Sequence, residues 1–207
     1  MQGMMMNQSL SIIEILRYAA EAHPGGEVVS VRTEGDLHRE SYAEAYLRAA
    51  QLAHGLSGLD IARGDRVATL AWNGHRHFEL YYGVSGMGAV CHTINPRLSA
   101  EQMLYIIHHA GDRVLCFDTT FLPIVEGIAD QLPKGLHLVA MTDRAHMPES
   151  PLNLLCYEEL LDGQDTTFDW PQLPEDTAAA LCYTSGTTGN PKGALYTHRS
   201  TVLHAMG

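Results

Sequence analysis

Short apolar runs alternate with stretches of helical periodicity through the middle of this chain. The apolar runs, each long enough for one strand, cover residues 67–71, 89–93, 114–117 and 136–141. The stretches with apolar residues at helical spacing cover residues 77–87, 99–111 and 121–130. Strands that are joined through a helix usually pair in parallel. The alternation therefore predicts an α/β fold, in which a mixed or parallel sheet is covered by helices on both faces.

The flanking segments add further elements to this pattern. Ser9 is expected to open a helix that ends near Pro24, and residues 28–32 and 37–39 are expected to pair as a hairpin. Residues 143–174 are predicted to be a long connection with one short helix at 157–161. Two helix starts show the spacing of a capping box, with Glu or Gln three residues after Ser: Ser41 with Glu44, and Ser99 with Gln102.

The charge and the termini exclude several classes of protein. The 207 residues include 24 acids and 13 Lys or Arg, for a formal net charge of −11, which disfavours nucleic acid and anionic lipid as partners. The first residues lack the basic and apolar regions of a signal peptide. No window approaches 18 uninterrupted apolar residues. We therefore expect a soluble cytoplasmic protein that has no transmembrane segment.

Cysteine and histidine spacing predicts no metal site. The four cysteines lie far apart in apolar runs without a CxxC pair, and are expected to be buried reduced thiols: Cys91, Cys116, Cys156 and Cys182. His75 with His77, and His108 with His109, have no carboxylate or cysteine at ligand spacing. These histidines are predicted to lie on the surface.

The stretch YTSGTTGNPKG at residues 183–193 follows the apolar run of residues 178–183 and leads into another strand pattern at 194–197. Gly186, Gly189 and Gly193 are expected to allow positive φ and close approach of a ligand. Hydroxyl donors and the charge of Lys192 complete a cradle for a polyphosphate. None of the 24 acids lies after Asp176, which leaves the last 31 residues free of negative side chains.

Two other interpretations of this stretch fit less well. A flexible Gly/Ser/Thr linker seldom follows a buried strand or runs directly into another one. A Walker A loop needs Ser or Thr after its lysine and a helix immediately afterwards. Here Gly193 follows Lys192, and a strand pattern comes next. A phosphate cradle between two strands is therefore the favoured interpretation.

Residues 181–193, LCYTSGTTGNPKG, resemble the signature phosphate loop of the adenylate-forming, or AMP-binding, superfamily. Ser41-Tyr42 before a helix, and the stretch from Gly86 to Leu98, resemble two further core motifs in the same order. The resemblance covers essentially the whole chain. Residues 196–204, YTHRSTVLH, are most similar to acyl-CoA synthetases for fatty acids or 3-methylmercaptopropionate.

The resemblance implies an ATP-dependent acid–thiol ligase. A carboxylic acid, expected to be a fatty acid, would form an acyl-adenylate with ATP, and CoA as co-substrate would take the acyl group. Mg²⁺ would accompany the phosphates, and Lys192 would act as the catalytic charge partner of the departing pyrophosphate. The residues that the resemblance assigns to nucleotide binding are Thr184, Ser185, Gly186, Thr187, Thr188, Gly189, Lys192 and Gly193.

The resemblance also implies that residues 1–207 form the N-terminal part of an adenylation domain, without the later motifs or a C-terminal domain. The chain alone is therefore expected to be inactive. Two alternatives stay open at this point. One is a related adenylation enzyme that loads a carrier protein instead of CoA. The other is a truncated protein without catalytic activity.

Overall fold

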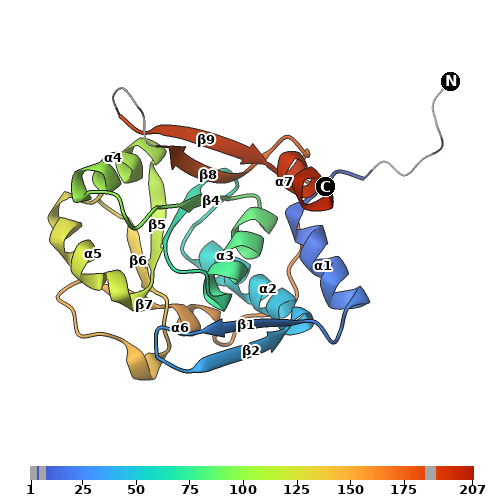
Figure 1. The fold of residues 1–207 in the computed structure, drawn as a ribbon, viewed down its shortest axis with the longest axis horizontal. Coiled ribbons are helices and arrows are strands. Elements are labelled where there is room, and N and C mark those ends of the chain that lie inside the picture. The colour runs from blue at the N-terminus through green and yellow to red at the C-terminus, as the bar shows by residue number, and fades with distance from the viewer. Residues whose placement is uncertain (1–3, 5–7, 185–189) are drawn as a thin grey trace.

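The computed structural model describes residues 4, 8–184 and 190–207. Its centre is a seven-stranded sheet (Figure 1), in which every neighbouring pair is parallel except the last. In spatial order the strands are β7 (Leu154–Cys156), β6 (His137–Ala140), β5 (Asp112–Phe117), β3 (Arg66–Leu70), β4 (Val90–Thr93), β8 (Ala178–Thr184) and β9 (Lys192–Thr197). This mixed sheet confirms the predicted α/β fold.

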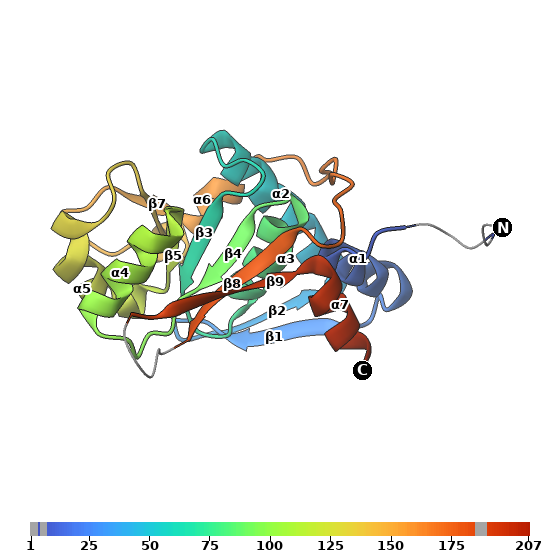
Figure 2. The ribbon, with the colours of Figure 1, turned by 90° about the horizontal axis from the view of Figure 1, so that it is seen from above.

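Helices cover both faces of the sheet (Figure 2). One face carries α2 (Tyr42–Gly58), α3 (His75–Gly86) and α6 (Tyr157–Leu161), and α1 (Ile12–Ala22) packs on α2 and α3. The other face carries α4 (Ala100–Ala110) and α5 (Leu122–Ile128). Successive strand residues enter opposite cores, as Cys116 and Phe117 of β5 do. Burial on both faces explains why these strands are continuous apolar runs.

Both predicted capping boxes are present. Ser41 Oγ accepts a hydrogen bond from the Glu44 backbone N–H at 3.1 Å, and the Ser41 N–H donates to the Glu44 carboxylate at 2.7 Å. Ser99 and Gln102 make the equivalent pair, with both distances at 3.2 Å. These local signals fixed the starts of α2 and α4 correctly because each box satisfies backbone donors at the helix start without a distant partner.

The predicted start of the first helix at Ser9 is wrong. Helix α1 begins at Ile12, with Ser11 in the N-cap position and no side-chain cap bond. The Ile12 N–H instead donates to Nδ1 of His198 at 3.2 Å. His198 lies in the first turn of α7 (His198–Met206), so a residue 186 positions away satisfies this helix end. No pattern within the first helix could reveal such a partner.

Strand β7 is an element that the sequence did not predict. It has only three residues and lies inside the long connection of residues 143–174, where the predicted short helix at 157–161 is confirmed as α6. Strand β7 pairs in parallel with β6, from Leu138 opposite Leu154 to Ala140 opposite Cys156. A run this short has no recognisable periodicity, and its strand conformation depends on the edge of the sheet beside it.

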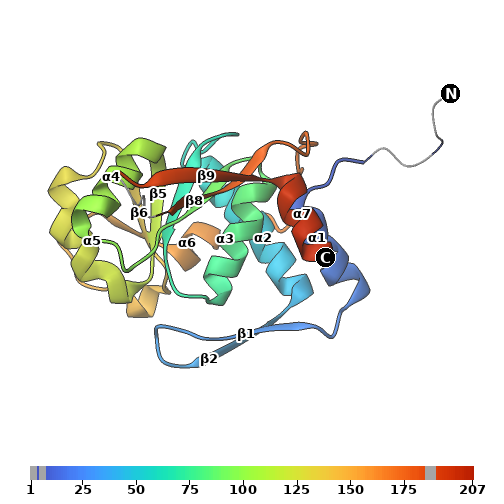
Figure 3. The same ribbon diagram turned by 45° about the horizontal axis from the view of Figure 1, so that its top comes forward.

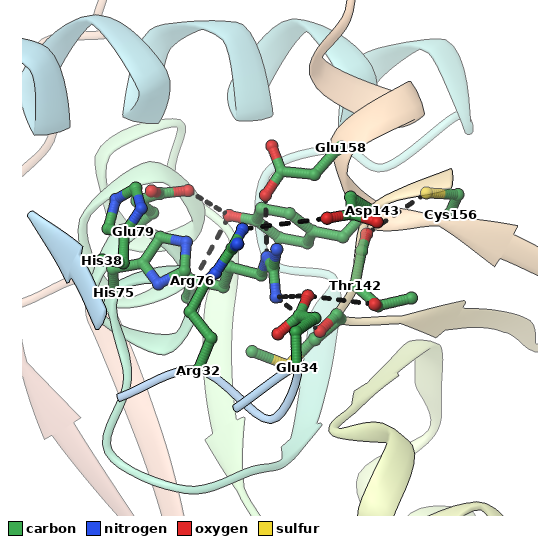
Figure 4. A network of polar contacts seen from close by, with 12 residues as sticks. Arg32, Glu34, His38, His75, Arg76, Glu79, Thr142, Asp143, Cys156 and Glu158 are labelled. Atoms are coloured by element: carbon green, nitrogen blue, oxygen red, sulfur yellow. Dashed lines mark hydrogen bonds and ion pairs between the residues drawn. The ribbon is translucent and has the colours of Figure 1, made fainter. Parts of the chain in front are cut away.

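The predicted hairpin forms from β1 (Glu27–Val31) and β2 (Leu37–Ser41) and stands apart from the main sheet (Figure 3). Buried ion pairs join it to the helices. Arg76 of α3 donates to Glu34 in the hairpin turn at 2.7 Å and to Glu158 of α6 at 2.7 Å, so it lies between the two carboxylates (Figure 4). We call the whole set the hairpin network: Glu34, His38, Glu40, Arg48, His75, Arg76, Glu79, Tyr157 and Glu158.

The hairpin network contains four carboxylates and only two guanidinium groups. Glu40 is 4% exposed, and neither of its carboxylate oxygens has a hydrogen-bond partner among the described residues. Arg48 Nε lies 3.7 Å from Glu40 but only 2.7 Å from Glu79, to which it donates. Burial raises the pKa of Glu40 to about 7 and shifts the pKa of Glu79 in the same direction. The pair therefore retains a proton well above the usual range of a carboxyl group.

The proton that Glu40 and Glu79 retain makes the free energy of unfolding depend on pH. Between about pH 4.5 and 7 the unfolded state loses the Glu40 proton while the folded state keeps it, so the free energy of unfolding falls as the pH rises. We expect Glu40→Gln to remove this fall in the free energy of unfolding with rising pH. The variant should be more stable than the wild type by about 1–3 kcal/mol at pH 8, with the gain vanishing near pH 4.5. Urea unfolding at both pH values measures the difference.

The exposed carboxylate Glu149 lies in a loop and provides the control substitution Glu149→Gln, which should follow the wild type at both pH values. The titration of His38 and His75, whose pKa values burial lowers, is common to the wild type and to Glu149→Gln. Because His38 Nε2 lies 3.4 Å from the Glu40 carboxylate, the slope that Glu40→Gln removes includes the effect of this contact. An unchanged pH slope in Glu40→Gln would show that Glu40 does not hold the proton.

Candidate functional site

The described ends of the predicted phosphate loop lie at the tip of the β8–β9 ribbon. Thr184 is the last residue of β8, and Lys192 and Gly193 are the first residues of β9. The two strands are antiparallel, with Thr184 opposite Lys192, and the Thr184 hydroxyl donates to the Lys192 carbonyl at 3.4 Å. The structure thus brings three of the predicted site residues together. The remaining five lie outside the described residues: Ser185, Gly186, Thr187, Thr188 and Gly189.

The position of this tip follows from the topology of the sheet. Strand β8 is parallel to β4, so its end lies on the edge where the parallel strands have their carboxyl ends. Open α/β sheets bind their ligands along that edge. The tip projects beside α4 at the end of the sheet (Figures 1 and 3). Lys192 is exposed there. It belongs to residues 177–207, which contain no Asp or Glu. A polyphosphate could therefore approach Lys192 without meeting a carboxylate from that segment.

Gly193 corrects one part of the sequence prediction. Its φ is not positive, and it lies in the extended conformation of β9. A Cβ atom at this position would lie 3.1 Å from Cδ1 of Leu181 and 3.3 Å from Cζ of Tyr183. Glycine is favoured here because a Cβ atom would crowd the Leu181 and Tyr183 side chains, which would have to shift to make room for it. Gly193 thus lets the two sides of the ribbon approach each other closely.

The two histidines in the first turn of α3 are buried, so the prediction that they lie on the surface is wrong. His75 and His77 are 3% and 7% exposed, whereas His108 and His109 are exposed as predicted. His77 bonds to the Thr69 hydroxyl at 3.0 Å and to the Trp72 carbonyl at 3.1 Å. Burial lowers the pKa of both buried histidines, which keeps them neutral. Within residues 8–184 and 190–207 no group of three His, Cys, Asp or Glu side chains is arranged to hold a metal ion.

A second polar site lies at the carboxyl ends of β3, β5 and β6. A cavity of about 170 Å³ is lined there by Trp72, Arg76 and Asp118, among others. The Asp118 carboxylate accepts from the Trp72 backbone N–H at 2.6 Å, and burial raises its pKa to about 6. Thr184, Lys192 and Gly193, the predicted site residues that the structure describes, do not line this cavity. Because Arg76 is already paired with Glu34 and Glu158, the β8–β9 tip is the better candidate for an anionic ligand.

Comparisons with known proteins agree with the sequence motifs. A family model described as "AMP-binding enzyme" matches residues 16–207. The chain is 51% identical to the 3-methylmercaptopropionyl-CoA ligase of Ruegeria lacuscaerulensis, over 100% of this chain and 38% of that protein. It is 49% identical to the medium-chain-fatty-acid–CoA ligase of Ectopseudomonas oleovorans, again over 100% of this chain and 38% of the relative. The chain therefore spans about 38% of the length of these curated relatives.

A solved structure extends this similarity to the fold. The crystal structure of the anthranilate CoA ligase AuaEII in complex with anthranoyl-AMP superimposes with a TM-score of 0.86 and 25% identity. The match covers 97% of this chain and 37% of that one. No helix in the described part of the chain is long and apolar enough to cross a membrane. Family model, relatives and fold confirm the resemblance derived from the motifs: the chain belongs to the AMP-binding enzyme family.

Proposed function

We propose that this chain supplies the triphosphate-holding part of an ATP-dependent acyl-CoA ligase. The observation that carries the proposal is the β8–β9 tip, where Thr184 and Lys192 lie opposite each other at the carboxyl edge of the sheet. On this proposal residues 1–207 are an N-terminal part of the adenylation domain, which is supported by the 38% of each relative that the chain matches.

The reaction would proceed in two steps. A carboxylate oxygen attacks the α-phosphorus of ATP, and the bond to the bridging oxygen of the β-phosphate breaks. The products are an acyl-adenylate and pyrophosphate. The thiol of CoA then loses its proton and attacks the acyl carbon, which forms the thioester and releases AMP. The first step develops negative charge on the departing pyrophosphate, where preorganised donors have their largest effect.

Each residue of the tip would make its own contribution to stabilising the departing pyrophosphate. Lys192 would place its ammonium charge against the pyrophosphate oxygens. Thr184 would donate its hydroxyl, since the 3.4 Å contact with the Lys192 carbonyl is long enough to exchange for a phosphate oxygen. Ser185, Gly186, Thr187, Thr188 and Gly189 would contact the same phosphates. Mg²⁺ would arrive with ATP and neutralise part of the phosphate charge.

The names of the relatives support an aliphatic carboxylic acid as substrate. The two relatives above act on 3-methylmercaptopropionate and on medium-chain fatty acids, and a third, from Thermus thermophilus, is a long-chain-fatty-acid–CoA ligase that is 46% identical. All three names specify CoA as the acceptor, which favours CoA over a carrier protein. The four free cysteines are compatible with a reducing compartment such as the cytoplasm.

The first test concerns the chain by itself. We expect residues 1–207 to show no carboxylate-dependent exchange of labelled pyrophosphate into ATP, because the tip offers phosphate contacts only. Fusing the chain to the rest of the Ruegeria lacuscaerulensis ligase, beyond the 38% that it matches, should restore exchange with an aliphatic acid. The native ligase, in which the same remainder follows its own N-terminal part, serves as the positive control. A folded chimera that lacks exchange would contradict the proposal.

The second test concerns Lys192. In the active chimera, Lys192→Ala should slow acyl-adenylate formation about 10- to 100-fold, the effect of losing a charge-assisted contact of roughly 1.5–3 kcal/mol. Transfer of the acyl group to CoA should change less, because pyrophosphate has already left. Single-turnover measurements separate the two steps. Lys134, the only other lysine, also lies in a Pro-Lys-Gly sequence and is exposed, so Lys134→Ala is a matched control. Equal slowing of both steps would show that Lys192 does not act specifically on the departing pyrophosphate.

A further inference from the structure

The end of the β8–β9 ribbon projects beyond its neighbour in the sheet. Strand β4 pairs with β8 only as far as Thr93 opposite Cys182. Tyr183 and Thr184 therefore pair with β9 alone, opposite Gly193 and Lys192. A two-stranded ribbon twists more than a wide sheet and is only marginally stable by itself. The pairing fixes the spacing of Thr184 and Lys192, but the position of this pair relative to the sheet depends on contacts that hold the ribbon from the side.

Tyr183 provides a contact on that side. Its hydroxyl and Nδ1 of His109 form a hydrogen bond of 2.6 Å. His109 lies in the last turn of α4, which is followed by Gly111 as a left-handed C-cap. The His109 ring stacks on Tyr105 with centroids 5.4 Å apart. This bond links the end of β8 to α4, and the two elements lie near each other in the fold (Figure 3).

The ring of Tyr183 is held on two more sides. Its centroid lies 5.2 Å from that of His92, which is fully buried on β4. Nδ1 of His92 lies 2.9 Å from the Asp112 carboxylate, so the His92 ring is itself fixed in place. Gly193 of β9 is the partner of Tyr183 across the ribbon and lies close to the phenol ring. We call His92, His109, Tyr183 and Gly193 the Tyr183 cluster.

We propose that Tyr183, through its hydrogen bond to His109, is a positioning residue for phosphate binding. The bond fixes the projecting end of β8 against α4, and it thereby sets where Thr184 and Lys192 present their donors. This inference rests on the proposed function of the tip. It adds a residue outside the phosphate-contacting set, and it assigns α4 a part in holding the site.

The test uses the 207-residue chain labelled with ¹⁵N and titrated with inorganic pyrophosphate. The amide signals of Thr184 and Lys192 report binding, and thermal unfolding reports stability. Tyr183→Phe removes the hydroxyl and keeps the ring against His92 and Gly193. We expect it to raise the dissociation constant about 3- to 10-fold, the range for loss of one hydrogen bond, with an unchanged Tm. His109→Ala should raise the dissociation constant to the same extent, whatever the loss of its stacking on Tyr105 does to Tm, and the double variant should bind no more weakly than either single variant.

His108→Ala is the matched control, since His108 is also exposed on α4 but bonds to the Gln131 carbonyl instead. It should bind pyrophosphate as the wild type does. Unchanged binding by Tyr183→Phe, additive effects in the double variant, or a Tm of Tyr183→Phe that falls along with its binding would each overturn the positioning role. A wild-type chain without any pyrophosphate binding would contradict the proposed function of the tip itself, and the positioning role with it.

Discussion

A parallel sheet must be covered on both faces, and most of this structure depends on that constraint. Each central strand has to supply apolar side chains to two cores, as Cys116 and Phe117 do on opposite faces of β5. Most crossovers between the parallel strands contain a helix, and these helices provide the cover. The same arrangement brings the carboxyl ends of the strands to one edge. The end of β8, at Thr184, therefore lies at the ligand-binding edge because of the sheet, whatever side chain it carries.

The features that could be predicted from the sequence are those with local causes. The capping boxes at Ser41 and Ser99 act within one helical turn, and the apolar runs of the central strands are visible without knowledge of their partners. Features that depend on distant residues could not be predicted. Ile12 starts a helix because His198 accepts its N–H, and β7 exists because β6 lies beside it. The burial of His75 and His77 requires the hairpin network and the Trp72 turn, which no spacing pattern reveals.

The candidate site also combines features with local causes and features that depend on distant residues. Glycine, hydroxyl and lysine at residues 183–193 were sufficient to indicate phosphate chemistry. The reason for glycine at position 193 was not visible, because it lies in the packing of Leu181 and Tyr183 across the ribbon. His109 was noticed only as one of a pair of histidines, since its partner is 74 residues away. Sequence motifs thus predicted the groups that are proposed to touch a ligand, whereas the contacts around these groups, such as the Tyr183–His109 bond, appeared only in the structure.

The sheet order also has a consequence for how the chain folds. After β7 completes one edge, the chain crosses to the opposite edge before β8 can pair with β4, and Thr93 and Cys182 are 89 positions apart. Contacts of such long range form slowly, because the entropy of closing the loop is lost before pairing stabilises it. The ribbon that carries the candidate site therefore joins a sheet whose other strands can already be paired. In hydrogen exchange from the native state, the same ribbon should be among the first parts to open.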